Sequence, residues 1–459
     1  MFQTYKHVHF VGIGGIGMSA LAKWFLHEGV AVSGSDVHLS AITHDLETRG
    51  AHIFSGHAPT NISVDVDLLV YSPAVPSTNI ERAVSEERGI PSWTNFEVLG
   101  EISKSFSTIV VSGTNGKSTT TAMLGLMLEA AGYDPTVLVG SFVPGFKDGN
   151  FRQGGGRFFV VEGCEYRANM LNFSPEMIVL TNIEEDHLDY YRDLAHIQET
   201  FQIFVDKLKG QGMVVVNADD AGSRVLQVSR PITYGSTRTD PTYQFEERKT
   251  SMGSQMVRTN VGEFELQIPG EFNVYNALAA TSAALELGVP FETCRRVLKE
   301  FRGIWRRFER VGVWKGADVI SDYGHHPSAV KQTIEAAREF FPGRRIVLCY
   351  QPHQHDRTKK LFEEFVETLP LADHVILTEI YDVAGRNAVP ALPPGRRGGR
   401  QEEADVSSRD LVKAINTSHT TYASNLKEAE SQLREVVQPG DVVLIIGAGD
   451  IDEVARRLS

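Results

Sequence analysis

Residues 108–121 read Thr-Ile-Val-Val-Ser-Gly-Thr-Asn-Gly-Lys-Ser-Thr-Thr-Thr, and this stretch decides the fold of the chain. Its apolar run at 109–111 predicts a buried strand, and the run at 122–128 predicts a helix with one apolar face. A glycine-rich loop separates the two. The stretch therefore predicts strand, loop and helix in that order.

The loop between this strand and helix has the chemistry of a phosphate-binding site. Its glycines let backbone N–H groups converge on an anion, and the helix N-terminus adds its positive end. Lys117 supplies a movable charge, and Ser118 or Thr119 can ligate a magnesium ion. The loop has the short form G-x-x-G-K-S, because Val111 stands where the standard phosphate loop has its first glycine. It predicts binding of a nucleoside triphosphate.

Composition bounds the remaining possibilities. A length of 459 residues suggests roughly three domains. The net charge of −13 argues against a nucleic-acid partner. Three scattered cysteines fit a reducing compartment rather than a disulfide framework. No apolar run reaches about 18 residues and the start has no signal-peptide character, so we expect a cytoplasmic protein without membrane insertion.

A second glycine-rich turn lies near the start of the chain. Residues 7–11 predict a strand that runs into Gly12-Ile-Gly-Gly-Ile-Gly17, a helix is expected over 18–27, and a strand at 30–36 ends at Asp36. This is a dinucleotide-binding fingerprint. Its glycines show only that a backbone can approach a diphosphate. A dinucleotide and a nucleotide sugar both carry this group, so the turn is compatible with either ligand. Further strand units are expected at 67–73 and 90–93.

The middle of the chain places acidic groups after buried strands. Glu162 and Glu165 follow the run at 157–161, and Asp186 and His187 close the segment that begins at Met177. Oxygen ligands from Ser118 and Glu162 together with the His187 imidazole suit a hard divalent cation, so we expect Mg²⁺.

Two polar pairs farther along have less specific chemistry. Asn273 and Asn276 share one face near the start of a helix expected over 270–287, where they either cap the helix or hydrogen-bond an adenine edge. Arg306 and Arg307 either supply charge for phosphate or form a solvated basic turn.

The last third repeats the strand–helix alternation and predicts another α/β domain. The expected strands cover 318–321, 345–350, 374–378 and 441–446. Four histidines gather in two strand-end segments of this domain: His325, His326, His353 and His355. Residues 387–408 have no periodicity and predict a mobile loop.

The predicted fold class is thus α/β with three domains. Residues 1–106 form a Rossmann-like domain, residues 107–310 a central parallel sheet of the P-loop ATPase type, and residues 311–459 a second Rossmann-like domain.

Several segments in this order resemble the Mur ligase family, the ATP-dependent amide-forming enzymes that build the peptide stem of peptidoglycan. They are Phe10-Val-Gly-Ile-Gly-Gly-Ile-Gly-Met-Ser19, Ser33-Gly-Ser-Asp36, Gly113-Thr-Asn-Gly-Lys-Ser-Thr-Thr120, Thr181-Asn-Ile183 with Asp186-His187, Asn273 with Asn276-Ala-Leu-Ala279, Arg307-Phe-Glu309 and Asp322-Tyr-Gly-His-His-Pro327. The resemblance spans nearly the whole chain, and the family's pattern also has the short phosphate loop.

The resemblance implies that the first domain holds the UDP of a sugar nucleotide, the second binds ATP and the third brings the amino acid. The implied UDP-sugar site is Gly14, Gly15, Ile16, Gly17, Asp36 and Ser72. The implied ATP site is Gly113, Thr114, Asn115, Gly116, Lys117, Ser118, Thr119, Asn273, Asn276, Arg307 and Asp322. The implied amino-acid site is Tyr323, His325 and Arg357. Ser118 and Glu162 would hold one magnesium ion and His187 a second. The implied catalytic residues are Lys117, Glu162, His187, His325 and Arg357.

The implied activity joins L-alanine to the lactyl carboxylate of UDP-N-acetylmuramate. The carboxylate attacks the γ-phosphate of ATP to give an acyl phosphate, and the amine of the amino acid then displaces phosphate. A neutral amine is required, so a base near His325 is expected. The expected partners are these small molecules, with the protein a monomer or a weak homodimer.

The chain departs from the family's pattern in two segments. Gln354 and His355 stand where many alanine-adding members carry an arginine and an aromatic residue, and Cys164 stands at the position of a commoner carboxylate. No lysine occurs between Asp186 and Asp206, so we expect no carbamylated lysine.

Other functions stay open. A recycling ligase joins the same sugar nucleotide to a recovered tripeptide, but it usually carries another motif where Gln351-Pro-His353 stands. Folylpolyglutamate synthase shares the central loop without the first domain. An NAD-dependent dehydrogenase would explain residues 12–36 but not Lys117, and a nucleotide sensor without catalysis is also conceivable.

Overall fold

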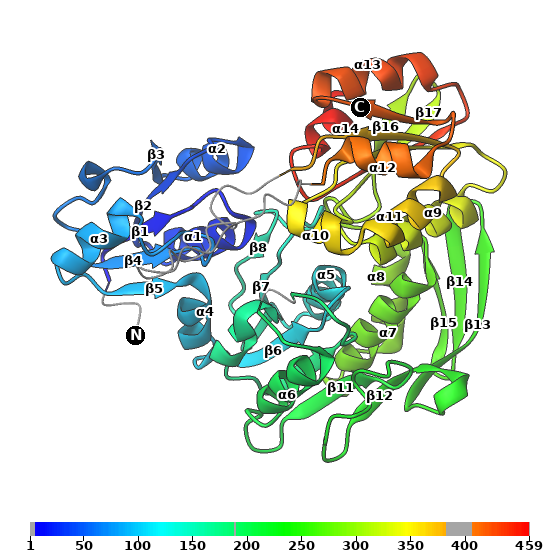
Figure 1. The fold of residues 1–459 in the computed structure, drawn as a ribbon. Helices are drawn as coiled ribbons and strands as arrows, with labels where there is room; N and C mark the ends of the chain where they lie inside the picture. The colour runs from blue at the N-terminus through cyan, green and yellow to red at the C-terminus, as the bar shows by residue number, and fades with distance from the viewer. Residues whose placement is uncertain (1–4, 188–189, 382–405, 459) are drawn as a thin grey trace. The chain divides into compact units, whose positions relative to one another are not determined.

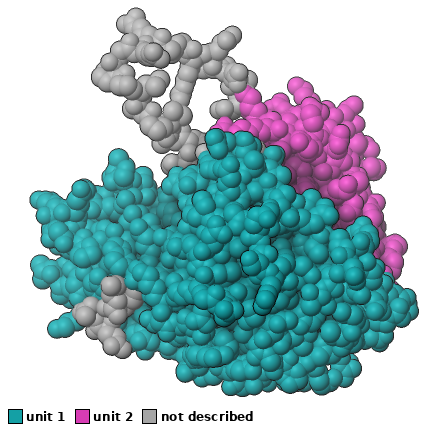
Figure 2. Space-filling model, turned by 90° about the horizontal axis from the view of Figure 1, so that it is seen from below, with its two compact units in different colours: residues 1–249, 256–266, 272–301 teal, residues 250–255, 267–271, 302–459 magenta. Residues whose placement is uncertain are grey.

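The computed structural model of the chain describes residues 5–187, 190–381 and 406–458. The chain forms two compact units, residues 1–249, 256–266 and 272–301 and residues 250–255, 267–271 and 302–459 (Figure 2). No helix within the described ranges combines the length and the apolarity that a membrane span requires. Most of the loop predicted at 387–408 lies outside the described residues.

The first sheet belongs to the N-terminal part of the first unit, drawn in blue in Figure 1. Its strands pair in parallel in the order β3-β2-β1-β4-β5. They are β1 (His7–Val11), β2 (Ala31–Asp36), β3 (His52–Ser55), β4 (Leu68–Tyr71) and β5 (Ser92–Thr94), and the helices are α1 (Ile16–His27), α2 (Ala41–Thr48), α3 (Ile80–Glu87) and α4 (Asn95–Ser103). Ser40, Asn79 and Thr94 cap α2, α3 and α4 through their side-chain oxygens.

The second sheet, also parallel through its middle, carries the phosphate loop. Its order is β15-β14-β13-β12-β11-β10-β6-β9-β7-β8, with β8 antiparallel to β7. The strands are β6 (Ser107–Ser112), β7 (Thr136–Leu138), β8 (Phe151–Arg152), β9 (Phe158–Gly163), β10 (Met177–Leu180), β11 (Met213–Asn217), β12 (Ile232–Ser236), β13 (Tyr243–Ser251), β14 (Ser254–Thr259) and β15 (Gly262–Leu266). The helices are α5 (Lys117–Ala130), α6 (Leu194–Val205), α7 (Glu271–Glu286) and α8 (Phe291–Glu300).

The third sheet lies in the second unit and has the order β16-β17-β21-β18-β19-β20. Only β16 runs antiparallel to its neighbour among these described strands. The strands are β16 (Glu309–Trp314), β17 (Ala317–Asp322), β18 (Ile346–Tyr350), β19 (His374–Thr378), β20 (Thr420–Ala423) and β21 (Val442–Ile446). The helices are α9 (Pro327–Phe340), α10 (His355–Lys360), α11 (Phe362–Thr368), α12 (Ser408–Ile415), α13 (Leu426–Val436) and α14 (Asp452–Arg457).

These sheets confirm the predicted α/β class with parallel strands. Strand β6 lies between β10 and β9 in the middle of its sheet, and its residues 108–112 are all buried. A strand covered on both faces is expected to be continuously apolar, which explains the run at 109–111. Because parallel strands end at a common edge, the loops after β6, β9 and β10 meet there.

A buried carboxylate joins α3 to the first sheet. Glu81 is fully buried and accepts hydrogen bonds from Ser35 Oγ (2.5 Å) and Asn61 Nδ2 (2.6 Å). The Nδ1 atom of His57 lies 3.3 Å from the carboxylate and the Nε2 atom of His9 lies 3.6 Å from it. Burial alone would raise the pKa of Glu81, but His9, Ser35 and Asn61 lower that pKa to about 2.

Replacing this carboxylate should destabilise the fold in a pH-dependent way. A pKa of about 2 against an ordinary value of 4.5 corresponds to roughly 3 kcal/mol of stability. Because the folded-state pKa is the lower one, the contribution is complete above pH 4.5 and is lost as the pH falls toward 2. We expect Glu81→Gln to reduce the free energy of unfolding near pH 7, with the deficit shrinking in acid, as measured by urea denaturation.

The matched control is Glu86→Gln, because Glu86 is exposed on the same helix. We expect its free energy of unfolding to follow the wild type at each pH. A deficit of Glu81→Gln that stayed constant down to about pH 3 would contradict the assigned pKa.

Candidate functional site

The phosphate loop joins β6 to α5 and is shaped by two glycines with positive φ. Gly113 has φ 137° and Gly116, the N-cap of α5, has φ 83°. A Cβ on Gly113 would lie 2.1 Å from Thr181 Oγ1, and one on Gly116 would lie 2.2 Å from Asn276 Oδ1. Neither position accepts a larger residue, because both the backbone conformation and the space require glycine.

The segment after β10 holds this loop in place. Thr114 N donates to the Asn182 carbonyl and Asn115 N donates to Asn182 Oδ1, each at 2.9 Å. Thr181 Oγ1 donates to the Asn115 carbonyl (2.6 Å). The N-terminal N–H groups of α5 are thereby presented at the edge of the sheet, where an anion is stabilised.

The charge of Lys117 is kept at the start of α5 by a carboxylate. Its Nζ atom lies 2.8 Å from Glu165 Oε2 and donates to the carbonyls of Gly113 (2.6 Å) and Thr114 (3.0 Å). Burial favours the neutral amine, but the surrounding groups, first among them Glu165, outweigh this effect and raise the pKa of Lys117. The ammonium therefore stays charged at the site expected to bind phosphate.

Glu162, the fifth residue of β9, faces the other side of the loop. Ser118 Oγ donates to Glu162 Oε2 (3.0 Å), and Gly140 N donates to Glu162 Oε1. The structure thus brings together two of the three predicted metal ligands. A hydroxyl and a carboxylate are hard oxygen donors of the type that Mg²⁺ prefers.

The third predicted ligand, His187, which the resemblance gives to a second magnesium ion, lies in a different group of side chains. His187 Nε2 is 3.4 Å from Glu165 Oε1 and 3.8 Å from Asp186 Oδ2. One ligand atom from each of these three residues lies within 4.8 Å of the others, a spacing that could hold a cation. Burial would raise the pKa of Glu165, but Lys117 and His187 bring it below its ordinary value.

Glu165 and Asp186 are absent from the metal and catalytic sets that the sequence predicts. The signal that could have found Glu165 is its position two residues beyond the end of β9. Between the two glutamates lies Cys164, whose pKa is raised to about 12 by burial and by Glu165. This thiol carries no charge at neutral pH, so the site keeps one carboxylate fewer than the commoner family pattern.

Asn273 and Asn276 lie in the first turns of α7 and are buried against the phosphate loop. Asn276 Nδ2 donates to Asn273 Oδ1 (3.1 Å), and Thr120 Oγ1 donates to Asn276 Oδ1 (3.4 Å). The predicted grouping of these amides with the loop is therefore seen in the structure.

The glycine turn of the first sheet brings its predicted residues together as well. Gly14 N donates to Asp36 Oδ2 (2.9 Å), and Gly15 is the N-cap of α1, which begins at Ile16. Ser72 follows β4, and its N–H donates to the Val11 carbonyl (3.1 Å) at the end of β1. The turn, Asp36 and Ser72 thus lie along the carboxyl edge of this sheet, where diphosphates bind.

In the second unit, Asp322 ends β17 and is held by backbone donors. Phe308 N donates to Asp322 Oδ2 (2.7 Å) and Gly324 N donates to Asp322 Oδ1 (2.8 Å). Burial raises the pKa of Asp322, while Arg307 opposes the shift. The Tyr323 ring centroid lies 5.1 Å from the guanidinium carbons of both Arg306 and Arg307.

The two arginines differ in their contacts. Arg306 is buried and donates to the carbonyls of Gly447 and Gly449. Its role in the unit is therefore to fix the loop after β21. Of the pair, Arg307 is the residue named in the predicted ATP site.

The predicted amino-acid residues cluster at the carboxyl ends of β17 and β18. The Tyr323 and His325 rings lie 5.6 Å apart, and Arg357 Nη1 lies 3.3 Å from His353 Nδ1. His353 stacks on Tyr381 with centroids 5.8 Å apart. Desolvation, together with the nearby Arg357 and His353, lowers the pKa of His325 well below its ordinary value of 6.5, so its imidazole is neutral at pH 7.

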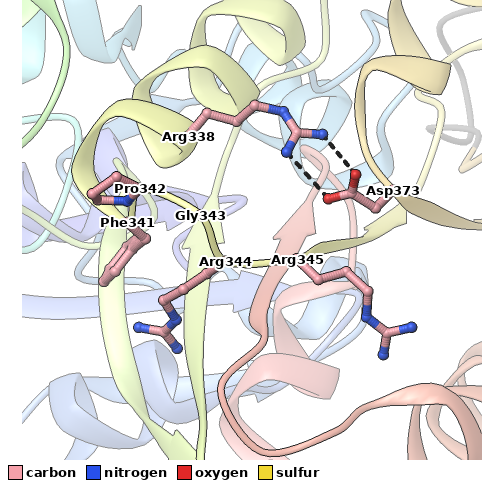
Figure 3. A pocket seen from close by; sticks show the side chains of 7 residues that line it. All are labelled: Arg338, Phe341, Pro342, Gly343, Arg344, Arg345 and Asp373. Carbon is pink, nitrogen blue, oxygen red and sulfur yellow. Dashed lines mark hydrogen bonds and ion pairs between the residues drawn. The ribbon is translucent and has the colours of Figure 1, made fainter.

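A hollow of about 500 Å³ lies at the opposite edge of this sheet, before β18 and β19 (Figure 3). Arg338 pairs with Asp373 (3.1 Å), Arg344 with Asp318 (2.6 Å) and Arg345 with Asp441 (2.7 Å). The arginine charges are thus balanced within the fold. The hollow lies away from the candidate site, which is at the carboxyl edge of the strands, where parallel sheets bind ligands.

Comparison with known families shows three matches along the chain. Residues 7–107 match the Mur ligase family, catalytic domain. Residues 111–284 match the Mur ligase middle domain, and residues 306–449 match the Mur ligase, glutamate ligase domain.

Similar sequences and structures cover the chain from end to end. A UDP-N-acetylmuramate–L-alanine ligase of Alkaliphilus metalliredigens is 39% identical over 99% of this chain and 97% of its own length. One from Caldanaerobacter subterraneus subsp. tengcongensis is 37% identical over the same shares. The crystal structure of a UDP-N-acetylmuramate-alanine ligase from Thermotoga maritima superposes with a TM-score of 0.83 at 30% identity, covering 98% of each chain. A murein peptide ligase from Psychrobacter arcticus has the same fold, with a TM-score of 0.71 at 23% identity.

Removing the carboxylate beside Lys117 should change the titration of this lysine. In Glu165→Gln, burial still favours the neutral amine while the main opposing charge is gone, so we expect the pKa of Lys117 to fall. The pH dependence of the Lys117 ¹³Cε chemical shift measures this directly. Lys104, exposed at the end of α4, is the internal reference, because its recorded ion pair is with Glu101. An unchanged Lys117 titration would show that Glu165 does not hold the charge.

Proposed function

Because the chain belongs to the Mur ligase family, we propose that it joins L-alanine to the lactyl carboxylate of UDP-N-acetylmuramate, with conversion of ATP to ADP and phosphate. The observation that carries the proposal is the phosphate loop in which Lys117 meets Glu165 and Ser118 meets Glu162. This arrangement suits phosphoryl transfer, where catalysis consists mainly of positioning and charge stabilisation. The proposed substrates are those in the names of the similar ligases.

In the first step the lactyl carboxylate attacks the γ-phosphate, the β–γ phosphoanhydride bond breaks, and an acyl phosphate forms as ADP leaves. The N–H groups at the start of α5 and the Lys117 ammonium stabilise the charge that develops on the transferred group. Asn273 and Asn276 lie close enough to the loop to contribute to the ATP site. The glycine turn at 12–17, with Asp36 and Ser72, binds the UDP moiety of the other substrate.

Magnesium fits the oxygen donors of this site. Ser118 and Glu162 would hold one ion, and His187, together with Glu165 and Asp186, would hold a second. Such ions act as Lewis acids that neutralise phosphate charge.

In the second step the amine of L-alanine attacks the acyl phosphate and phosphate leaves. Tyr323, His325 and Arg357 lie together in the second unit and form the amino-acid site, where Arg357 pairs with the substrate carboxylate. The neutral imidazole of His325 can accept a hydrogen bond from the amine and so favours its deprotonated form.

One assay separates this function from its alternatives. The protein is incubated with UDP-N-acetylmuramate, ATP and Mg²⁺ together with each amino acid or the stem tripeptide, and phosphate release is measured. We expect release with L-alanine. Release only with tripeptide would identify a recycling ligase, and hydride transfer to NAD without phosphate release would identify a dehydrogenase.

The metal assignment predicts the effect of a second substitution. Glu162→Gln keeps the shape of the side chain but loses the charge that would hold Mg²⁺, so we expect turnover to fall at least about 100-fold with the fold preserved. Rate measurements over a range of Mg²⁺ concentrations and circular dichroism check both parts. Glu176→Gln is the control, because Glu176 is exposed near the start of β10. An unaffected rate in Glu162→Gln would remove this residue from the site.

A further inference from the structure

Helix α1 buries a lysine whose partners lie far away in the sequence. Lys23 is 1% exposed, between apolar neighbours on a helix that is buried from Met18 to Phe25. Its Nζ atom donates to the Asp148 carbonyl (2.8 Å) and to Asn150 Oδ1 (3.0 Å). It also lies 2.9 Å from Asp45 Oδ2 on α2. The ammonium thus links two helices of the first sheet to the segment 139–150 between β7 and β8.

Further charges complete the cluster around Lys23. Arg49 bridges the carboxylates of Asp45 and Asp148, and the Nε2 atom of His27 lies 3.1 Å from Asp148 Oδ2. The carboxylates of Asp45 and Asp148 therefore balance the charges of Lys23 and Arg49. The cluster has no free charge to offer a ligand, so its role is to hold the segments together.

The segment 139–150, which we call the bridging loop, touches both nucleotide sites. Its ends are tied together by a hydrogen bond from Val139 N to the Asn150 carbonyl (3.0 Å). Near one end, Gly140 N donates to Glu162, the carboxylate that meets Ser118.

The other end of the bridging loop meets the glycine turn. Asn150 is fully buried, and its Nδ2 atom donates to the carbonyl of Ile16 (2.7 Å), the first residue of α1, and to Ser19 Oγ (3.0 Å). Through this loop, the start of the diphosphate-binding helix is connected to the ATP site.

Stability alone does not account for a lysine at this position. Burying an ion pair costs desolvation free energy that its attraction often only offsets, and an apolar side chain is frequently as stable. A hydrogen-bonded ammonium instead fixes three acceptors at one geometry. In a reaction between two bound substrates, a misplacement of about 1 Å can cost about 100-fold in rate.

We propose that Lys23 is a positioning residue that clamps the bridging loop onto α1 and thereby sets the placement of the UDP-sugar carboxylate relative to the γ-phosphate of ATP. This role rests on the proposed function. Lys23 touches neither substrate and acts through Asp148, Asn150 and Gly140. Loss of the Lys23 side chain changes how the UDP-sugar site and the ATP site are placed relative to each other, while the phosphate loop keeps its own contacts.

The test is the steady-state kinetics of Lys23→Met, expressed per folded molecule. We expect kcat/KM for UDP-N-acetylmuramate to fall at least about 10-fold, while KM for ATP changes less than about twofold. A merely structural role would lower the folded fraction and leave the kinetic constants of the folded molecules unchanged. Lys104→Met is the matched control, since Lys104 is 55% exposed and pairs with Glu101 on the surface.

A second variant guards against a Lys23→Met protein that does not fold. Asn150→Asp keeps an acceptor for Lys23 but removes the donor to Ile16 and Ser19. We again expect kcat/KM for UDP-N-acetylmuramate to fall while KM for ATP changes little. Hydrogen exchange in residues 139–150, which does not depend on the reaction, should become faster in both variants.

The outcomes separate the two proposals. No alanine-dependent phosphate release from the wild type would refute the proposed function. An active wild type with variants that show wild-type constants for both substrates would overturn the role of Lys23, even if hydrogen exchange became faster.

Discussion

A positive charge kept beside a buried carboxylate is the constraint on which the central site depends. Lys117 must remain an ammonium at the start of α5, and the adjoining Glu165 is the main charge that opposes its desolvation there. This requires β9 to end at Gly163, so that the chain turns Glu165 toward the phosphate loop. It also requires glycine at 113 and 116, since the loop passes close to Thr181 and Asn276.

The Glu165 carboxylate also contacts His187, and this contact joins the segments that follow β9 and β10. Glu165 faces His187 with one oxygen and Lys117 with the other, so the segments after β9 and β10 converge on the loop after β6. His187 has φ 55°, an uncommon conformation for a residue with a side chain, and such strain is typical of functional sites. The edge of one parallel sheet thereby gathers the groups that phosphate chemistry needs.

The sequence predicts much of this architecture because local patterns carry it. The apolar run at 109–111 predicts β6, and the glycine turns at 12–17 and 113–116 mark the two proposed nucleotide sites. The predicted strand at 90–93 is displaced to 92–94, where Thr94 caps the next helix. Helix α1 begins at Ile16 rather than at Met18, since Gly15 already serves as its N-cap.

What local patterns cannot show is which distant polar groups meet. Strand spacing alone does not separate His187 from Glu162, and only the resemblance gives them to different ions. In the structure the carboxylates beside His187 are those of Glu165 and Asp186. Lys23 reads as one polar residue in an apolar helix, and its partners Asp148 and Asn150 lie 125 and 127 positions away. Desolvation has a further consequence at the three cysteines, since it raises the pKa of each thiol to about 12; at the half-buried Cys164 the charge of Glu165 adds to the shift. Only the thiolate is nucleophilic, and roughly one such thiol in 10⁵ is ionised at neutral pH. We therefore expect the cysteines, including Cys164 beside the phosphate loop, to react slowly with peroxide and with alkylating reagents.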